Sequence, residues 1–183
     1  MKIFTLTQPV FVTEFTNHKL YKKELLDIIS KQPFVQNKDY GNNDKNITDW
    51  FVDKSVPRKY ADLLCNDLAL TLKEMLTGLG VIKFDISEIW FQQYYKNNTH
   101  AWHDHISANY ANVYYLELPE GTPVTTLINP LDKSIIVPEV KEGDILSFPG
   151  SIQHCSPPNK SNKRKTVIAF NIEFKDIYTP LLQ

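Results

Sequence analysis

Hydrophobic residues recur at helical spacing through the first 80 residues of the chain. Residues 1–15 predict one or two short extended segments, and segment 19–31 has apolar residues three and four positions apart, which predicts an amphipathic helix. A second helix is predicted between the start signals Ser55 and Pro57 and the stop signals Gly78 and Gly80. Its apolar stripe repeats every fourth residue and consists of Tyr60, Leu64, Leu68, Leu72 and Leu76. Stripes of this kind indicate helices that pack on a sheet.

From residue 81 onward the pattern changes to short runs of β-branched and aromatic residues separated by turn residues. The predicted strands are 86–95, 102–105, 110–118, 123–128, 134–138, 144–148 and 165–174. They indicate an α+β, mainly β fold: a double-stranded β-helix (jelly roll, cupin-like) with the N-terminal helices packed on one sheet. We expect a single domain, 1–183, in which 1–80 form a helical support region and 81–183 the double-stranded β-helix core.

Charge and composition narrow the classes of partner. Lys and Arg number 20 against 21 Asp and Glu, a formal net charge of −1, so no basic field predicts nucleic acid or a membrane as a partner. The densest basic stretch, 160–165, is interpreted as a solvated turn. No apolar run is long enough for a transmembrane span, and no secretory signal opens the chain. Cys65 and Cys155 lack CxxC spacing and are interpreted as reduced thiols of a cytoplasmic protein.

Three histidines in the β-rich half are candidate metal ligands. His103 and His105 stand two positions apart in a predicted strand, so their side chains are expected on one face, with Asp104 pointing away. His154 follows an apolar run, and a later strand can carry it back beside the first pair. Imidazole is a common ligand of iron, zinc, copper and nickel, and three facial ligands leave coordination positions open for a substrate.

Five motifs in the second half of the chain occur in an order typical of one enzyme family. They are Trp90 with Tyr94, His103-Asp104-His105, residues 113–116, residues 143–149 followed by His154, and residues 168–171. Through these motifs nearly half of the chain resembles the 2-oxoglutarate (2OG) and Fe(II)-dependent oxygenases, in the small prolyl-hydroxylase-like branch of bacteria and bacteriophages. The resemblance implies the same β-helix fold, a non-haem Fe(II) centre and 2OG as co-substrate.

The resemblance assigns the metal and the catalytic centre to His103, His105 and His154. Most members of the family have H-x-D or H-x-E as the first motif, which gives two histidines and one carboxylate. Here His105 occupies the carboxylate position, as in the branch to which the sequence is most similar. An imidazole in place of a carboxylate removes one negative charge from the ligand set, so zinc and copper stay open beside Fe(II). His100, in the polar loop before the motif, is expected at the rim of the pocket.

The family binds the distal carboxylate of 2OG with a cation, usually an arginine, at the start of the last barrel strand. Counting back along the family pattern places this role on Lys165. Asn171, on the same strand face, is a further candidate for contact with 2OG. Arg164 is the alternative: it is expected to point outward, although a guanidinium suits a carboxylate better. Tyr115 matches a family tyrosine that supports the same carboxylate and Tyr94 is a second candidate, while both could also be core residues.

The implied activity is that of a dioxygenase which consumes 2OG and dioxygen and hydroxylates a protein side chain, such as a prolyl, or a small molecule. The expected setting is the cytoplasm of a bacterium or of a phage-infected host cell. Two other interpretations stay open. A three-histidine cupin would use its metal without 2OG, but cupins usually place a carboxylate soon after H-x-H, and residues 106–109 contain none. A catalytically inactive barrel that acts as a binding module would keep only the fold, and the lysine at the arginine position favours it. The sequence does not identify the primary substrate, and a homodimer stays open as the oligomeric state.

Overall fold

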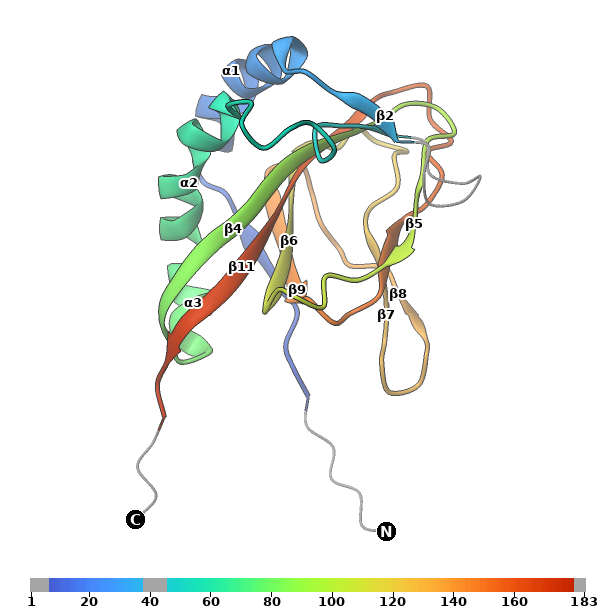
Figure 1. The fold of residues 1–183 in the computed structure, drawn as a ribbon. Coiled ribbons are helices and arrows are strands. Elements are labelled where there is room, and N and C mark those ends of the chain that lie inside the picture. The colour runs from blue at the N-terminus through green and yellow to red at the C-terminus, as the bar shows by residue number, and fades with distance from the viewer. Residues whose placement is uncertain (1–6, 38–45, 180–183) are drawn as a thin grey trace.

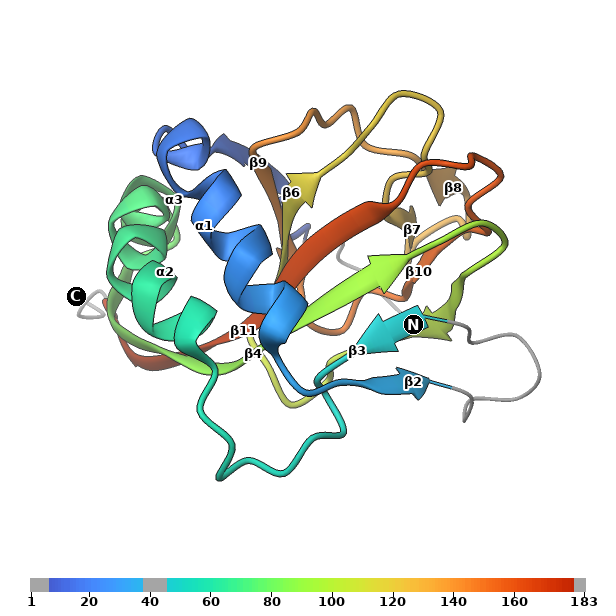
Figure 2. The ribbon, with the colours of Figure 1, turned by 90° about the horizontal axis from the view of Figure 1, so that it is seen from above.

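The structure, a computed structural model, describes residues 7–37 and 46–179. Figure 1 shows two β-sheets facing each other, with the helices on the outer side of the larger sheet. Seen from above, the helices lie on one side of the molecule and the smaller sheet on the other (Figure 2). This order of layers confirms the predicted mainly β, double-stranded β-helix fold with N-terminal helices packed on one sheet.

Both sheets are antiparallel. In the described residues the larger sheet has the order β1-β9-β6-β11-β4-β3-β2 and the smaller sheet the order β5-β10-β7-β8. The strands of the larger sheet are Phe11–Glu14 (β1), Val35–Asn37 (β2), Asn46–Thr48 (β3), Val81–Tyr94 (β4), Tyr110–Glu117 (β6), Asp144–Pro149 (β9) and Lys165–Ile177 (β11). Those of the smaller sheet are His100–His103 (β5), Thr126–Ile128 (β7), Ile135–Ile136 (β8) and His154–Ser156 (β10).

Strand β11 separates two hydrophobic cores because successive side chains point to opposite faces of a sheet. Ile168, Phe170 and Ile172 pack in the cluster that contains the helices, whereas Val167 packs with Leu127 of the smaller sheet. The helix side of the large sheet is therefore a packing face. The opposite face, enclosed by the smaller sheet, is where the polar site is built.

The helices are α1 (His18–Lys31), α2 (Lys59–Thr71) and α3 (Lys73–Gly78). The prediction of α1 is confirmed, but the second predicted helix is divided at Leu72. Leu72 is completely buried and its N–H still donates to Leu68 O at 3.0 Å. The apolar stripe therefore runs unbroken across the division, which is why apolar spacing alone predicts one helix. Each buried leucine of the stripe contributes roughly 1.5–3 kcal/mol through burial.

The observed strands differ from the predicted ones in bounds and in number: β4 begins at Val81 rather than at 86, and β7 and β8 are shorter than predicted. The predicted strand 102–105 is wrong at its end, because β5 stops at His103. The short strands β2, β3 and β10 are absent from the prediction. Of the extended segments predicted in 1–15, strand β1 is observed, and residues 1–6 lie outside the described residues.

No helix among the described residues combines the length and the apolar character that crossing a bilayer requires. Cys65 and Cys155 are both free thiols.

Candidate metal centre

His103, His105 and His154 converge at one point on the inner side of the smaller sheet. Their ligand atoms all lie within 4.8 Å of one another. Strands β5 and β10 pair with His103 directly opposite His154, and side chains at paired positions share a face. The His154 ring also packs edge-on against Phe148 of the larger sheet, with ring centroids 4.6 Å apart. Strand pairing therefore brings together two of the three imidazoles.

His105 reaches the same point from a loop. Its N–H donates to Gly150 O at 2.8 Å, and its carbonyl accepts from Ala108 N–H at 2.8 Å, so the chain turns instead of continuing as a strand. A Cβ atom on Gly150 would lie 2.2 Å from Ala108 O and 2.5 Å from His105 O. Only glycine permits this close approach. The prediction that His103 and His105 share a strand face is thus wrong, although both imidazoles reach the centre.

Hydrogen bonds fix the tautomer of all three imidazoles. Each Nδ1 atom faces an oxygen that can only accept: His103 faces Ala101 O at 2.8 Å, His105 faces Asn171 Oδ1 at 2.8 Å, and His154 faces Ile152 O at 3.0 Å. Each Nδ1 must therefore carry the hydrogen, which leaves the lone pair of a neutral ring on Nε2. The three rings are therefore held with Nε2 available to coordinate a metal, and a second hydrogen bond of this kind is usual for histidines that bind one.

Glu88 fixes the orientation of the Asn171 side chain. The register of β4 and β11 places Asn171 opposite Glu88, and Asn171 Nδ2 donates to Glu88 Oε2 at 3.0 Å. Because a carboxylate only accepts, the amide nitrogen faces Glu88 and the amide oxygen faces His105. One amide thus connects a carboxylate to His105.

Burial keeps the histidines in the form that can bind a metal. Removal from water lowers the pKa of His154 well below its ordinary value, and the neighbouring His103 lowers it further. The same two causes lower the pKa of His105. Neutral imidazole is the ligand form, so His105 and His154 are ready to coordinate at neutral pH.

His100 lies inside the site rather than only at its rim. Its ring stacks on His103 with centroids 4.0 Å apart, and Gln92 Nε2 donates to its Nδ1 at 3.1 Å. Burial lowers the pKa of His100 to about 3. Sequence reasoning missed Gln92 and Glu88 altogether, and the only signal for His100 is its place three residues before the H-x-H motif.

Lys165 lines the same narrow cavity as the three histidines. It is 1% exposed, its Nζ donates to Ser156 Oγ at 2.6 Å and to Pro123 O at 3.0 Å, and it lies 4.3 Å from the centre of the Tyr94 ring. Among the described residues no carboxylate forms an ion pair with Lys165, and removal from water lowers its pKa to about 7. A buried cation without a counter-ion is unfavourable, so the position suits an anionic ligand.

The other candidate co-substrate residues lie around this cavity in different ways. Arg164 points away from it and forms an ion pair with Glu117 at 2.8 Å. Tyr94 lines the cavity, and its hydroxyl donates to Gln92 Oε1 at 2.8 Å. Tyr115 is fully buried behind the wall, where its hydroxyl accepts from Thr125 N–H at 3.1 Å. Asn171 contacts His105, as described above.

The donor set fits a first-row transition metal. Three imidazole nitrogens that point to one place can occupy one side of an ion and leave the remaining positions open, and imidazole suits iron, zinc, copper and nickel. In the described part of the chain no carboxylate belongs to the group that could hold the ion. Metal identity is therefore not set by an acidic ligand.

No protein-family model matches the sequence, and no curated protein matches it. Solved structures match the fold. An oxidoreductase of the 2OG-Fe(II) oxygenase family from Burkholderia pseudomallei has a TM-score of 0.67 at 12% identity, covering 85% of this chain and 79% of that one. A prolyl-4-hydroxylase from Pseudomonas putida has a TM-score of 0.64 at 14% identity, covering 92% and 94%. The non-heme alpha-ketoglutarate-dependent epimerase SnoN from nogalamycin biosynthesis has a TM-score of 0.68 at 10% identity, covering 89% and 76%.

These matches confirm the predicted resemblance at the level of the fold. The chain has the double-stranded β-helix that is found in the 2OG-Fe(II) oxygenases, and the match extends over most of each compared chain. One fold carries both a hydroxylase and an epimerase here. Function must therefore be argued from the site.

Proposed function

We propose that the protein is a non-haem Fe(II)- and 2OG-dependent dioxygenase that hydroxylates a C–H bond of a second substrate. His103, His105 and His154 hold the metal through Nε2, and Lys165 receives the distal carboxylate of 2OG. One observation carries the proposal: a single cavity is lined both by three imidazoles in ligand form and by a buried ammonium that has no carboxylate partner among the described residues.

Strand β10 links the proposed metal ligand His154 to Ser156, the hydrogen-bond partner of Lys165. His154 and Ser156 stand two positions apart on β10, roughly 7 Å at the usual rise of a strand, and Ser156 Oγ accepts from Lys165 Nζ. The cavity itself has a volume of about 30 Å³, room for about two water molecules. Binding of 2OG therefore has to displace that water and move the flexible side chain of Lys165, whose four-carbon stem permits this.

The chain supplies binding, orientation and exclusion of water. Lys165 and Ser156 anchor one carboxylate, the Tyr94 ring faces the Lys165 ammonium group, and Tyr115 positions Thr125 in the wall. When bound, the metal supplies the redox chemistry with dioxygen. In the balanced reaction one oxygen atom of dioxygen enters the C–H bond, the other enters succinate, and the carboxyl group next to the keto carbon of 2OG leaves as carbon dioxide.

An anaerobic titration of the purified protein with Fe(II) and then 2OG tests the proposal. We expect a weak visible charge-transfer band from the chelated co-substrate, and succinate production after oxygen is admitted. His154→Ala should lower the metal content and abolish both signals. His18→Ala is the matched control, because His18 contacts Tyr114 and Glu142 away from the site, and it should keep them.

Other outcomes identify the alternatives. If iron binds but no band develops on addition of 2OG, a metalloenzyme of the cupin type is favoured. If no metal binds, the catalytically inactive binding module is favoured. The mass of the product separates hydroxylation, which adds one oxygen atom, from epimerisation, which adds none.

A further inference from the structure

A second, larger cavity opens beside the histidines toward solvent. It has a volume of about 650 Å³, within the range of small-molecule and side-chain sites. His100, His103 and His105 line both this outer cavity and the inner one. A group bound in the outer cavity therefore lies next to the metal centre, where the substrate to be oxidised belongs.

All three tryptophans of the chain line the outer cavity. They are Trp50, Trp90 and Trp102, and Phe51 joins them. Trp90 is buried, stacks on His105 with centroids 5.5 Å apart and meets Trp50 at 4.5 Å. Trp50, Phe51 and Trp102 remain 38%, 42% and 43% exposed. Large aromatic side chains left in water around one cavity mark a surface that binds something.

The charge of this cavity has one sign. Glu88 and Asp104 line it, and no lysine or arginine is among its described lining residues. Asp104 is exposed and forms no hydrogen bond or ion pair with the described residues. Glu88 Oε1 accepts from Lys54 Nζ at 3.3 Å, but the Lys54 side chain is 83% exposed, so this pair is weak and a competing cation can replace it. These two carboxylates therefore disfavour a phosphate or carboxylate group at their end of the cavity.

We propose that the outer cavity binds a cationic side chain, an ammonium or guanidinium group, and that the primary substrate of the proposed oxygenase belongs to this class. The proposal rests on the proposed function. Aromatic faces attract a cation through their negative π-face, and Asp104 and Glu88 add direct charge attraction at the rim. Lys54 on Glu88 shows that an ammonium group can occupy this position. A prolyl ring would gain from the aromatic wall but would leave the Asp104 carboxylate without a partner.

Tryptophan fluorescence measures binding independently of turnover, because every tryptophan of the chain lines this cavity. We would titrate the purified protein with the blocked pentapeptide Gly-Ala-Lys-Ala-Gly and with versions that carry arginine, acetyl-lysine, proline or glutamate at the centre. Lysine and arginine peptides should bind at least about fivefold more tightly than the three others. A single lysine with blocked termini is the further comparison: if it binds as tightly as the pentapeptide, the site recognises the side-chain amine alone and not a peptide segment.

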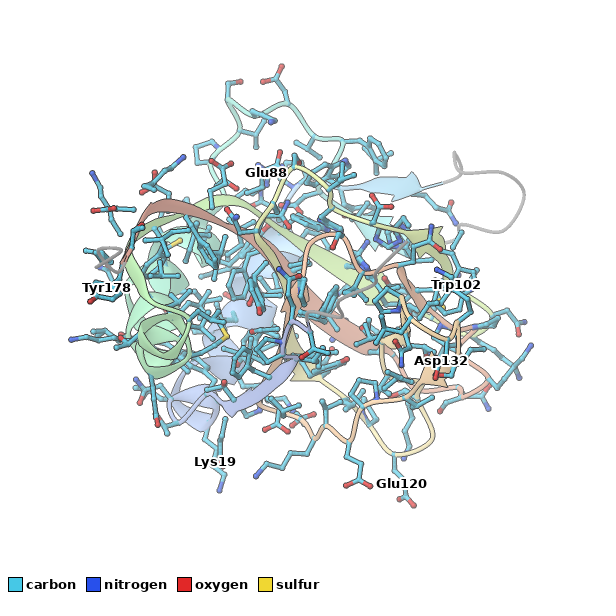
Figure 3. All side chains as sticks on the ribbon, turned by 90° about the horizontal axis from the view of Figure 1, so that it is seen from below. Lys19, Glu88, Trp102, Glu120, Asp132 and Tyr178 are labelled. Carbon is cyan, nitrogen blue, oxygen red and sulfur yellow. The ribbon has the colours of Figure 1, made fainter. Side chains whose placement is uncertain are left out.

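Two charge variants localise the effect. Asp104→Lys should weaken binding of the lysine peptide by about fivefold or more and reduce its preference over acetyl-lysine. Glu120→Lys makes the same change of charge on an exposed loop residue that lies at the opposite edge of the molecule from Glu88 (Figure 3) and should leave the affinity within about twofold.

The proposal and the function on which it rests fail in different ways. Equal affinity for the cationic and neutral peptides, or an equal loss in Asp104→Lys and Glu120→Lys, would overturn the cationic class even if the Fe(II)–2OG band develops. If the lysine peptide binds selectively but the Fe(II)–2OG band does not develop, the proposed class of ligand stands and the proposed oxygenase function is wrong. With both present, the lysine peptide should increase the release of succinate and gain one oxygen atom.

Discussion

Asn171 Oδ1 lies 2.8 Å from Nδ1 of His105, and Asn171 has this orientation because its amide nitrogen donates to Glu88. Of the three imidazoles, only His105 depends on a side chain for its tautomer, because His103 and His154 use backbone carbonyls. It is also the only one of the three on a loop. Its place in the centre therefore depends on residues that never touch the metal.

Asn171→Ala should weaken metal binding by about 10- to 100-fold, the usual cost of removing a partner that orients a ligating histidine. The His105 ring would lose the acceptor that keeps its hydrogen on Nδ1. Anaerobic Fe(II) titration, or Zn(II) titration in air, measures the change. Asn109→Ala is the control, since Asn109 accepts from Phe174 N–H and contacts no histidine of the centre. Equal affinities in the two variants would mean that Asn171 has no part in holding His105.

Gly150→Ala should damage both the stability and the metal site. The new methyl group would collide with the carbonyl oxygens of Ala108 and His105, and backbone atoms cannot move aside as a side chain can. We expect a loss of about 1–3 kcal/mol in the free energy of unfolding, the usual cost of overpacking, with weaker metal binding because the His105 loop is displaced.

Gly78→Ala is the matched control for that substitution. Nothing lies within 4 Å of a Cβ atom at Gly78, which ends helix α3, so the free energy of unfolding should stay the same or rise by up to about 1 kcal/mol. Chemical denaturation measures both variants. Normal metal affinity in Gly150→Ala would show that the His105 loop tolerates the shift.

The features of this protein that follow from the type and spacing of side chains could be predicted from the sequence. Alternation along β11 predicts that Lys165 and Asn171 share a face, and the observed strand sends Val167 to one core and Ile168 and Phe170 to the other. The three histidines stand out because imidazole is a common metal ligand and because they occur among motifs in a recognisable order. In the same way, alternation on β11 favours Lys165 over Arg164 as the inward-facing cation.

Other parts depend on contacts that no local pattern records. Strand β10, His-Cys-Ser, is too short to show alternation and forms because β5 and β7 flank it. The pairing of Glu88 with Asn171 follows from a register that shifts at the next residue of β11. Loop residue His105 is held by a turn 45 positions away, at Gly150. These relationships are non-local, so one sequence without coordinates cannot supply them.

The buried Lys165 should make stability depend on pH. Its pKa is about 7 in the folded protein and 10.5 in its ordinary state. Between these values the unfolded chain holds a proton that the folded chain lacks, so the free energy of unfolding rises with pH. Between pH 7 and 9.5 the free energy of unfolding of the wild-type protein should rise by about 1–3 kcal/mol more than that of Lys165→Met. Urea denaturation in the absence of 2OG measures this difference. If the free energies of unfolding of the two proteins changed with pH in parallel, the pKa of Lys165 would not be lowered.

The same group should make 2OG affinity fall with rising pH, opposite to the trend in stability. Bound 2OG places a carboxylate beside Lys165 and raises its pKa, so binding above pH 7 must take up a proton. The dissociation constant should then increase by up to about tenfold per pH unit, as measured by calorimetry on Mn(II)-loaded protein from pH 7 to 9.

Lys165→Arg should flatten this dependence of 2OG affinity on pH because a guanidinium keeps its charge, whereas Lys165→Ala should weaken 2OG binding at every pH. Arg164→Ala, which breaks the ion pair with Glu117, should keep the wild-type affinity and slope. If it loses 2OG instead, the co-substrate is bound by the neighbouring arginine.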